Sequence, residues 1–275
     1  MTSGLLRAVF LGALQGATEF LPVSSSGHLI IVPELLGWPP ASLTFDVAVH
    51  WATALAVILY FRTDWARMIA GSWRAARQRT LRGNDDARLL ALLMLGTVPA
   101  VMAGALLQDA LENAIAFDPH NLARLASLLL LVTGGMLALS DRVGSRERAA
   151  ADLRWPGALT IGLAQAVAIL PGISRSGATI AAGLGVGLRR TEAARFSFLL
   201  ATPVIIGAGT LQLSELAASG TSSEEVLLLA AGFFSALVVG YAAIAWLLSY
   251  LRRAPLTIFV VYTWIVGVLA LWLLR

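Results

Sequence analysis

Long apolar stretches with almost no charge constrain this chain more than any other feature of its sequence. Hydrophobic residues make up 58% of the chain and charged residues only 13%, whereas a soluble domain usually carries about 25% charged residues. Six stretches are close to the ~20 residues that a helix needs to cross a bilayer core; they are 43–61, 88–108, 122–140, 195–212, 225–250 and 256–274. The sequence therefore predicts an all-α polytopic membrane protein with about six transmembrane helices.

Two further apolar stretches, residues 4–37 and 156–188, are interrupted in the middle by proline, glycine and serine. The interruptions read LPVSSSGH and LPGISRSG, and the halves on either side are short for a full span. Irregular backbone at membrane depth is tolerated where it is buried in protein or lines a wet cavity. We therefore predict two re-entrant helical hairpins. The alternative is a pair of full spans at each place, which would return the chain to the same side.

Arginine accounts for all 20 basic side chains other than histidine, because the chain contains no lysine. Most arginines lie between the apolar stretches, at 62–88, 142–154, 189–195 and 252–253. The segments 109–121 and 213–225 carry acids and no arginine. The positive-inside rule then places the arginine-rich segments in the cytoplasm and both termini outside it. This interpretation accounts for the net charge of +4 without a nucleic acid partner, and the segment 62–88 is expected to be solvated.

The two interrupted stretches align without a gap. GALQGATEFLPVSSSGHLI begins at Gly12 and GLAQAVAILPGISRSGATI begins at Gly162, and Gln15 aligns with Gln165. Each copy would contain one hairpin followed by three spans, so the second copy enters from the opposite side. We predict a single membrane domain made of two inverted repeats, about 1–141 and 151–275. Such repeats place their site near the midplane, where they meet.

Glu19 is the most informative polar residue, because an ionisable side chain inside a membrane segment is costly and marks a functional site by default. Gln15 lies four residues earlier on the same helix face and would support it. Arg175 lies in the other interruption, and an ion pair between Glu19 and Arg175 is the structural alternative. The two interpretations are compatible, since such a pair would hold an empty site together.

The interruptions also carry the residues of a phosphate site. Consecutive small residues let backbone N–H groups converge on an anion, and a helix that begins after Gly27 would point its positive end there. Arginine adds planar, bidentate phosphate binding. The alternative is that the serines only cap helices. The predicted phosphate-binding residues are Ser24, Ser26, Ser174, Arg175, Ser176 and Thr179.

Three histidines and several tryptophans complete the polar candidates. His28 follows the first interruption and is a candidate acid, base or nucleophile. His50 lies one turn after Asp46 and is a further candidate for lining the cavity, whereas His120 is expected in a solvated loop. Tryptophans such as Trp155 suit anchoring at the membrane interface.

The segments LGALQGATEFLPVSSSGHLIIV and LPGISRSGATIAAGLGVGLRR resemble the two signature segments of the undecaprenyl-diphosphate phosphatase family, also called the bacitracin-resistance protein family. The resemblance covers the whole chain. It implies a phosphatase of the bacterial inner membrane whose site opens towards the periplasm. Such an enzyme hydrolyses undecaprenyl diphosphate to undecaprenyl phosphate and inorganic phosphate, which recycles the lipid carrier for cell-wall synthesis and confers resistance to bacitracin.

Carried over by position, the resemblance implies catalytic roles for four residues: Glu19, Ser25, His28 and Arg175. It also implies a divalent cation, Mg²⁺ or Ca²⁺, with Glu19 as a ligand. Many family members have glutamate where this chain has Gln15, and a glutamine cannot act as a base. A mechanism that needs two carboxylates therefore does not suit this chain.

A transporter or flippase for polyprenyl phosphate is the alternative function, because inverted repeats with broken helices are also a transporter design. A carrier, however, has no need of glutamate, serine and histidine around a phosphate site. The type 2 phosphatidic-acid phosphatases are excluded, because no histidine follows Arg175 at their spacing. The lipid tail of the substrate is expected between helices among membrane lipids, and the sequence leaves a homo-oligomer open.

Overall fold

The computed structural model describes residues 2–81, 83–115, 118–144, 147–216 and 223–275. Within this part of the chain every regular element is a helix, apart from an isolated β-bridge between Arg148 and Leu188. The predicted all-α fold class is therefore confirmed. The predictions for Arg82 and Arg146 lie outside the described residues.

Five described helices are long and apolar enough to cross a membrane. They are α3 (Leu43–Tyr60), α5 (Asp85–Ile115), α6 (Pro119–Val143), α9 (Arg190–Leu216) and α10 (Ser223–Leu251). The sixth predicted span corresponds to α11 (Thr257–Leu273), which is apolar but only 17 residues long. At about 1.5 Å per residue it is somewhat shorter than a bilayer core. The chain is thus a multi-pass membrane protein, and the predicted spans agree with the helices in position.

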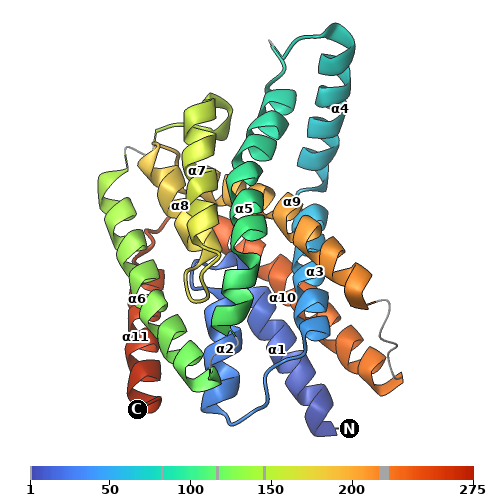
Figure 1. Cartoon of the computed structure of the whole chain (residues 1–275). Helices are drawn as coiled ribbons and strands as arrows, with labels where there is room; N and C mark the ends of the chain where they lie inside the picture. Colours follow the sequence, from blue (N-terminus) through green and yellow to red (C-terminus); the bar gives the residue numbers. More distant parts are fainter. Residues whose placement is uncertain (1, 82, 116–117, 145–146, 217–222) are drawn as a thin grey trace.

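The charged segment after α3 contains a helix of its own, α4 (Arg62–Gln78). In Figure 1 this helix extends beyond the rest of the bundle, beside the beginning of α5. Asp64 of α4 accepts a hydrogen bond from Arg195 of α9 at 2.7 Å. This contact fixes the base of α4 to the bundle. The prediction of a merely solvated segment therefore missed a regular element.

Each interrupted stretch forms two helices that meet at a sharp break. The first contains α1 (Thr2–Phe20) and α2 (Ser25–Leu35), and the second contains α7 (Trp155–Val167) and α8 (Arg175–Gly185). Figure 1 shows α1 and α2 in the lower half of the molecule and α7 and α8 in the upper half. The breaks touch in the middle, where Ser176 Oγ donates to the Leu21 carbonyl at 3.1 Å. Two helix pairs from opposite ends thus meet at one place.

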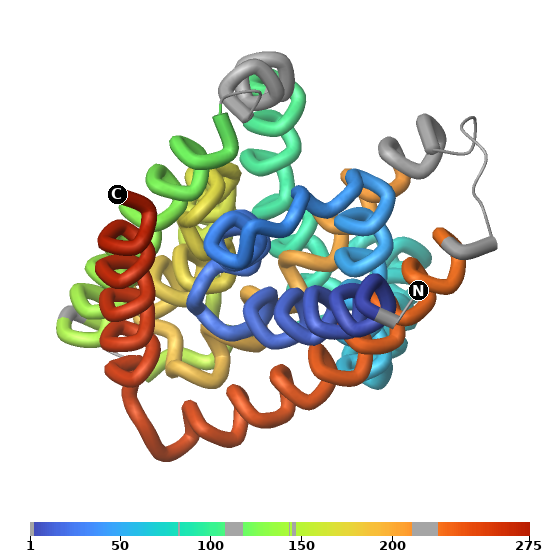
Figure 2. The backbone as a smooth tube through the Cα atoms, turned by 90° about the horizontal axis from the view of Figure 1, so that it is seen from below, coloured from blue at the N-terminus to red at the C-terminus, as the bar shows by residue number. Residues whose placement is uncertain are grey.

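Matched glycines of the two stretches make matched helix crossings. A Cβ atom added at Gly12 of α1 would lie 2.3 Å from the carbonyl oxygen of Gly232 in α10. A Cβ atom added at Gly162 of α7 would lie 2.3 Å from the carbonyl oxygen of Gly96 in α5. Figure 2 shows α1 running alongside α10. Aligned positions of the two stretches therefore pack in the same way, which supports the proposal of two inverted repeats.

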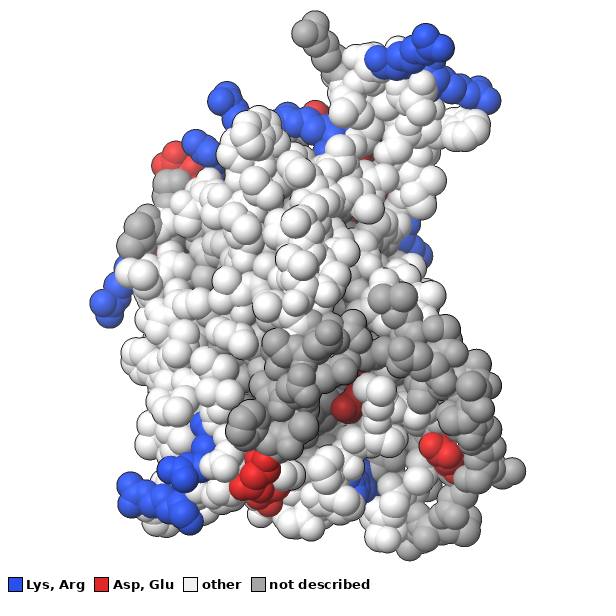
Figure 3. All heavy atoms as spheres, viewed as in Figure 1, with Lys and Arg blue, Asp and Glu red and all other residues white. Residues whose placement is uncertain are grey.

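Charged side chains on the molecular surface lie mainly toward the two ends of the molecule. On the face shown in Figure 3, arginine side chains gather at the upper end and at the lower left edge, and most of the middle is uncharged. Large apolar side chains such as Leu106, Val238 and Trp272 are more than half exposed. Such a broad exposed apolar surface is normal for a protein surrounded by lipid and abnormal for a soluble one.

We expect Gly12→Ala to lower the thermal unfolding temperature, because the new methyl group would meet the α10 backbone at the distance given above. Overpacking of this kind typically costs about 1–3 kcal/mol. Gly207→Ala is the matched control, since a Cβ atom at Gly207 of α9 meets nothing within 4 Å. The measurement is thermal unfolding of the purified proteins in detergent. Equal unfolding temperatures for Gly12→Ala and the wild type would show that α1 and α10 do not cross this closely.

Candidate active site

Glu19 is the centre of a buried polar cluster at the end of α1. Its side chain is only 6% exposed. Its Oε1 accepts a hydrogen bond from Arg175 Nη2 at 2.7 Å, and its Oε2 accepts from Ser25 Oγ at 2.6 Å and Gln15 Nε2 at 3.0 Å. Ser25 begins α2 and Arg175 begins α8. Both breaks and α1 therefore converge on a single carboxylate.

Arg175 is the cationic side of this cluster. Its side chain is 16% exposed, and its Nη1 donates to the Ser197 carbonyl at 3.4 Å. These described contacts use two of its five N–H donors, so others remain to bind an anion. An isolated charge in such a site would be costly, and the ion pair with Glu19 compensates for it. The Glu19–Arg175 ion pair that the sequence offered as the structural alternative is thus present, together with N–H donors that have no partner among the described contacts.

Two of the predicted phosphate-binding serines cap helices. Ser24 Oγ accepts from the Gly27 N–H at 3.2 Å, and Ser174 Oγ accepts from the Gly177 N–H at 3.0 Å. Ser24 has a φ of 72°, a left-handed conformation that is uncommon for any residue except glycine. Helix α2 begins at Ser25 and not after Gly27, which corrects the expectation. Its N-terminal end consequently lies beside Glu19.

The remaining predicted hydroxyl groups connect the two breaks with each other and with α9. Ser26 Oγ accepts from the Gly172 N–H at 3.4 Å, and Ser176 Oγ donates to the first break as described above. Thr179 Oγ1 donates to the Arg175 carbonyl at 2.8 Å and lies 2.6 Å from Ser197 Oγ. Among the described contacts, Ser25 is the predicted hydroxyl that touches Glu19.

His28 lies on α2 with both ring nitrogens engaged. Its Nδ1 is 2.7 Å from the Ser24 carbonyl oxygen, which can only accept, so Nδ1 carries the proton. In the neutral imidazole its Nε2 then accepts from Tyr262 Oη, at 2.8 Å, and the two rings are stacked with centroids 5.7 Å apart. Within the described contacts His28 touches neither Glu19 nor Arg175. His28 lies on the same helix turn as Ser25, and its ring is held by Tyr262 of α11.

The other two histidines lie in different surroundings. His50 Nε2 is 3.9 Å from Glu19 Oε2, and the His50 side chain is 37% exposed, so it lies on the more open side of the cluster. His50 thus adjoins the Glu19 cluster. His120, expected in a loop, instead lies in the first turn of α6, with Nδ1 3.3 Å from Glu34 Oε1.

Three residues near the site escaped the sequence interpretation. Thr133 of α6 accepts from the Ser174 N–H at 3.0 Å and donates to the Gly172 carbonyl at 3.3 Å. Ser197 of α9 contacts Arg175 and Thr179, and Tyr262 of α11 contacts His28. Thr133 and Ser197 are buried polar residues in apolar spans, which is a usable signal. A tyrosine in a membrane helix carries no comparable signal.

One carboxylate and one amide oxygen are available for a divalent cation. Gln15 Oε1 is buried and has no hydrogen-bond partner among the described residues, while Nε2 of the same side chain contacts Glu19. In the described part of the chain, no three or more histidine and carboxylate side chains are grouped so that they could hold a metal ion. Mg²⁺ usually binds through one or two carboxylates together with substrate phosphates and water. The residues present fit that pattern, although they would not form a complete protein cage.

Comparison with known proteins gives a consistent result. The family model described as bacitracin resistance protein BacA matches residues 8–269. An undecaprenyl-diphosphatase of Rubrobacter xylanophilus is 45% identical over 260 residues, which are 94% of each chain. An undecaprenyl-diphosphatase of Alcanivorax borkumensis is 44% identical over 272 residues, 97% of this chain and 98% of the relative. One of Pelobacter propionicus is 44% identical over 264 residues, 96% of this chain and 94% of the relative.

Proposed function

This chain belongs to the bacitracin resistance protein family, and we infer that it is an undecaprenyl-diphosphatase, as its relatives are named. The reaction is the hydrolysis of undecaprenyl diphosphate to undecaprenyl phosphate and inorganic phosphate. The observation that supports placing this reaction at the Glu19 cluster is the buried Glu19 carboxylate itself. It binds Arg175, which follows the break between α7 and α8, and Ser25, which follows the break between α1 and α2. A polyprenyl phosphate carrier would not need this combination.

Arg175 is the proposed phosphate clamp. Its free N–H donors and the N-terminal ends of α2 and α8 would bind the diphosphate, and helix N-termini favour anions. Phosphoryl transfer spreads charge over the equatorial oxygens of the transferred group, so fixed donors around that group lower the barrier. The cluster contributes by holding the phosphate in place and by stabilising the charge that develops on it.

Glu19 is the proposed general base. Its Oε2 is 2.6 Å from the Ser25 hydroxyl, close enough to take a proton directly. If Ser25 attacks phosphorus, its proton moves to Glu19, the bond to the lipid phosphate breaks, and water later releases phosphate from Ser25. If water attacks, the same carboxylate takes the proton of that water. Both routes give the same products, and only the first passes through a phosphorylated Ser25.

We also propose a divalent cation, Mg²⁺ or Ca²⁺, at Glu19. Support comes from the unpartnered Gln15 Oε1 next to this carboxylate and from the substrate, which brings its own phosphate oxygens. When bound, the cation would neutralise charge on the diphosphate. Glu19 and Gln15 would hold it.

The placement in the membrane is proposed from charge. Arginine-rich segments belong on the cytoplasmic side, which puts both termini on the opposite, periplasmic side. The inner membrane and a site entrance facing the periplasm are what the family resemblance implies. The helix pairs α1–α2 and α7–α8 would then be re-entrant hairpins, because their breaks meet in the middle of the bundle.

Labelling of single cysteines tests this orientation. The chain has no cysteine of its own, so Asp118→Cys and Thr80→Cys each provide one reactive position. We expect an impermeant thiol reagent to label Asp118→Cys in intact cells and to label Thr80→Cys only after permeabilisation. The reverse pattern would place the site entrance on the cytoplasmic side.

Product analysis tests the reaction. Purified protein supplied with undecaprenyl diphosphate should yield undecaprenyl phosphate and inorganic phosphate in equal amounts, as measured by mass spectrometry of the lipid and by a phosphate assay. Undecaprenol as the lipid product, or free diphosphate, would assign cleavage to a different bond and contradict the proposal.

Tyr262 is expected to position His28. Tyr262→Phe removes one hydrogen bond, worth about 0.5–1.5 kcal/mol, so turnover should fall roughly 2- to 10-fold. Tyr250→Phe is the control, since Tyr250 Oη donates to the Pro255 carbonyl outside the site. With three histidines in the chain, the ¹⁵N resonance of His28 Nε2 can be assigned by substitution. It should shift in Tyr262→Phe alone; an unchanged resonance would contradict the positioning role.

A further inference from the structure

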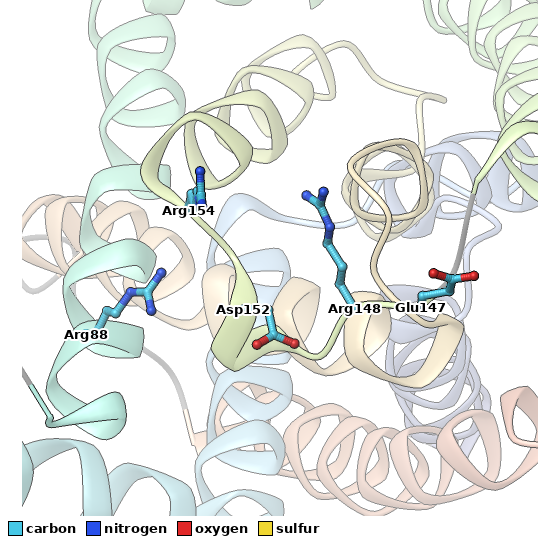
Figure 4. Close-up of a pocket in the computed structure, with 5 residues that line it drawn as sticks. All are labelled: Arg88, Glu147, Arg148, Asp152 and Arg154. Atoms are coloured by element: carbon cyan, nitrogen blue, oxygen red, sulfur yellow. The ribbon is translucent and has the colours of Figure 1, made fainter.

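A charged cavity of about 670 Å³ lies at the arginine-rich end of the molecule, beside the beginnings of α5 and α7. It is lined by Arg88, Glu147, Arg148, Asp152 and Arg154, which Figure 4 shows around one open space. None of these residues contacts Glu19 or Arg175 among the described interactions. The cavity is therefore separate from the proposed phosphatase site.

Two of the five charges hold the wall of the cavity together. Arg88 Nη2 donates to the Leu153 carbonyl at 2.8 Å. Asp152 Oδ2 accepts from the Ala149 N–H at 3.1 Å. These contacts shape the segment that joins the two halves of the chain. The other two arginines of the cavity, Arg148 and Arg154, take no part in these contacts.

Arg148 and Arg154 are the arginines with free donors. Arg148 makes one long side-chain contact, from Nη1 to the Val186 carbonyl at 3.4 Å. The Arg154 side chain makes no hydrogen bond or ion pair among the described residues. Figure 4 shows their guanidinium groups extending to the same side of the cavity, with Glu147 on the far side of Arg148. Two guanidinium groups that line one cavity attract an anion, and their planar geometry suits phosphate.

The position of the cavity relative to the membrane indicates which kind of phosphate compound can reach it. Arg154 directly precedes α7 and Trp155, whose side chain is 65% exposed. Arg88 lies in the first turns of α5, where a candidate membrane span begins at Asp85. Exposed tryptophan at the end of an apolar helix marks the headgroup region of a bilayer. Basic pockets between membrane helices at this level bind phospholipid headgroups.

We propose that this cavity binds the phosphodiester headgroup of an anionic phospholipid through Arg148 and Arg154. The site is independent of the phosphatase reaction. The bound lipid would lie at the junction of the two halves, against the segment that Arg88 holds. Binding there should stabilise the folded protein, and the stabilisation should rise with the logarithm of the lipid concentration above the Kd.

The test uses the full-length protein in a neutral detergent and three probes: dioctanoyl phosphatidylglycerol, dioctanoyl phosphatidylcholine and inorganic phosphate. Phosphatidylglycerol should raise the unfolding temperature at concentrations where phosphatidylcholine and phosphate have no effect. The double variant Arg148→Gln/Arg154→Gln should weaken this binding roughly tenfold or more. Arg62→Gln/Arg74→Gln is the matched control, because it removes the same charge from exposed positions of α4.

Several results would overturn the proposal. Equal shifts with phosphatidylglycerol and phosphatidylcholine would exclude recognition of an anionic headgroup. Equal affinity of the cavity variant and the control variant would exclude the two arginines. Saturation by inorganic phosphate at the same concentrations would assign the cavity to a soluble anion and contradict the lipid assignment. Phosphate release measured in parallel should stay at the wild-type level in both variants, which keeps this test apart from that of the proposed function.

Discussion

Replacing Arg175 with lysine is expected to reduce phosphatase turnover about 10²- to 10³-fold, the loss typical of removing one preorganised donor to a transition-state oxyanion. The charge is retained, so the ion pair with Glu19, now 2.7 Å, can persist and the protein should fold. Lysine, however, cannot reach the Ser197 carbonyl, Glu19 and a phosphate oxygen with one planar group. The measurement is phosphate release from undecaprenyl diphosphate under saturating substrate.

Arg190→Lys provides the control for this substitution. Arg190 forms an ion pair with Asp141 at 2.7 Å, outside the site, and should tolerate lysine with turnover near that of the wild type. Near-normal turnover of Arg175→Lys would refute the phosphate clamp. Equal losses in both variants would indicate a general effect of the arginine-to-lysine change on folding.

Glu19→Gln is expected to remove nearly all activity, because an amide can neither accept a proton from Ser25 nor carry the charge that binds a cation. Gln15→Ala should cost much less, since its amide donates a single hydrogen bond to the Glu19 carboxylate, worth about 1.5–3 kcal/mol. Gln15→Glu should stay active and depend more steeply on the divalent cation, because it adds a hard oxygen ligand. Phosphate release over a titration of Mg²⁺ and Ca²⁺ measures all three effects.

Gln165→Ala is the control for the Gln15 variants. Gln165 occupies the aligned position of the second stretch, is 3% exposed, and has no hydrogen-bond partner for its amide among the described residues. Its replacement should leave the cation dependence unchanged. An active Glu19→Gln with an inactive Gln15→Ala would show that the roles of the two residues are reversed.

Most of the fold could be predicted because a helix that crosses a membrane must be about 20 residues long and mostly apolar, and both properties can be read from the sequence. The long apolar stretches became α3, α5, α6, α9 and α10, and the interruptions became breaks between helices. Helix α4 was missed because its exposed face is charged, and hydropathy alone cannot distinguish a solvated helix from a solvated loop.

The candidate site was predictable only in part. Glu19 and Arg175 could be singled out because a charge inside an apolar segment requires a reason. The serines were ambiguous, since the same hydroxyl can cap a helix or bind an anion, and Ser24 caps α2 in this structure. Tyr262 was not predictable, because its contact with His28 joins residues 234 positions apart and depends entirely on how α11 packs.

The polar cluster around Glu19 is expected to perform chemistry and not to serve transport. The most direct measurement is phosphate release from undecaprenyl diphosphate by the purified protein in detergent, where no membrane separates two compartments and no gradient exists. We expect multiple turnovers under these conditions, and we expect Glu19→Gln to abolish them. Absence of phosphate release from wild-type protein that remains folded and binds the substrate would show that the Glu19 cluster does not catalyse this hydrolysis.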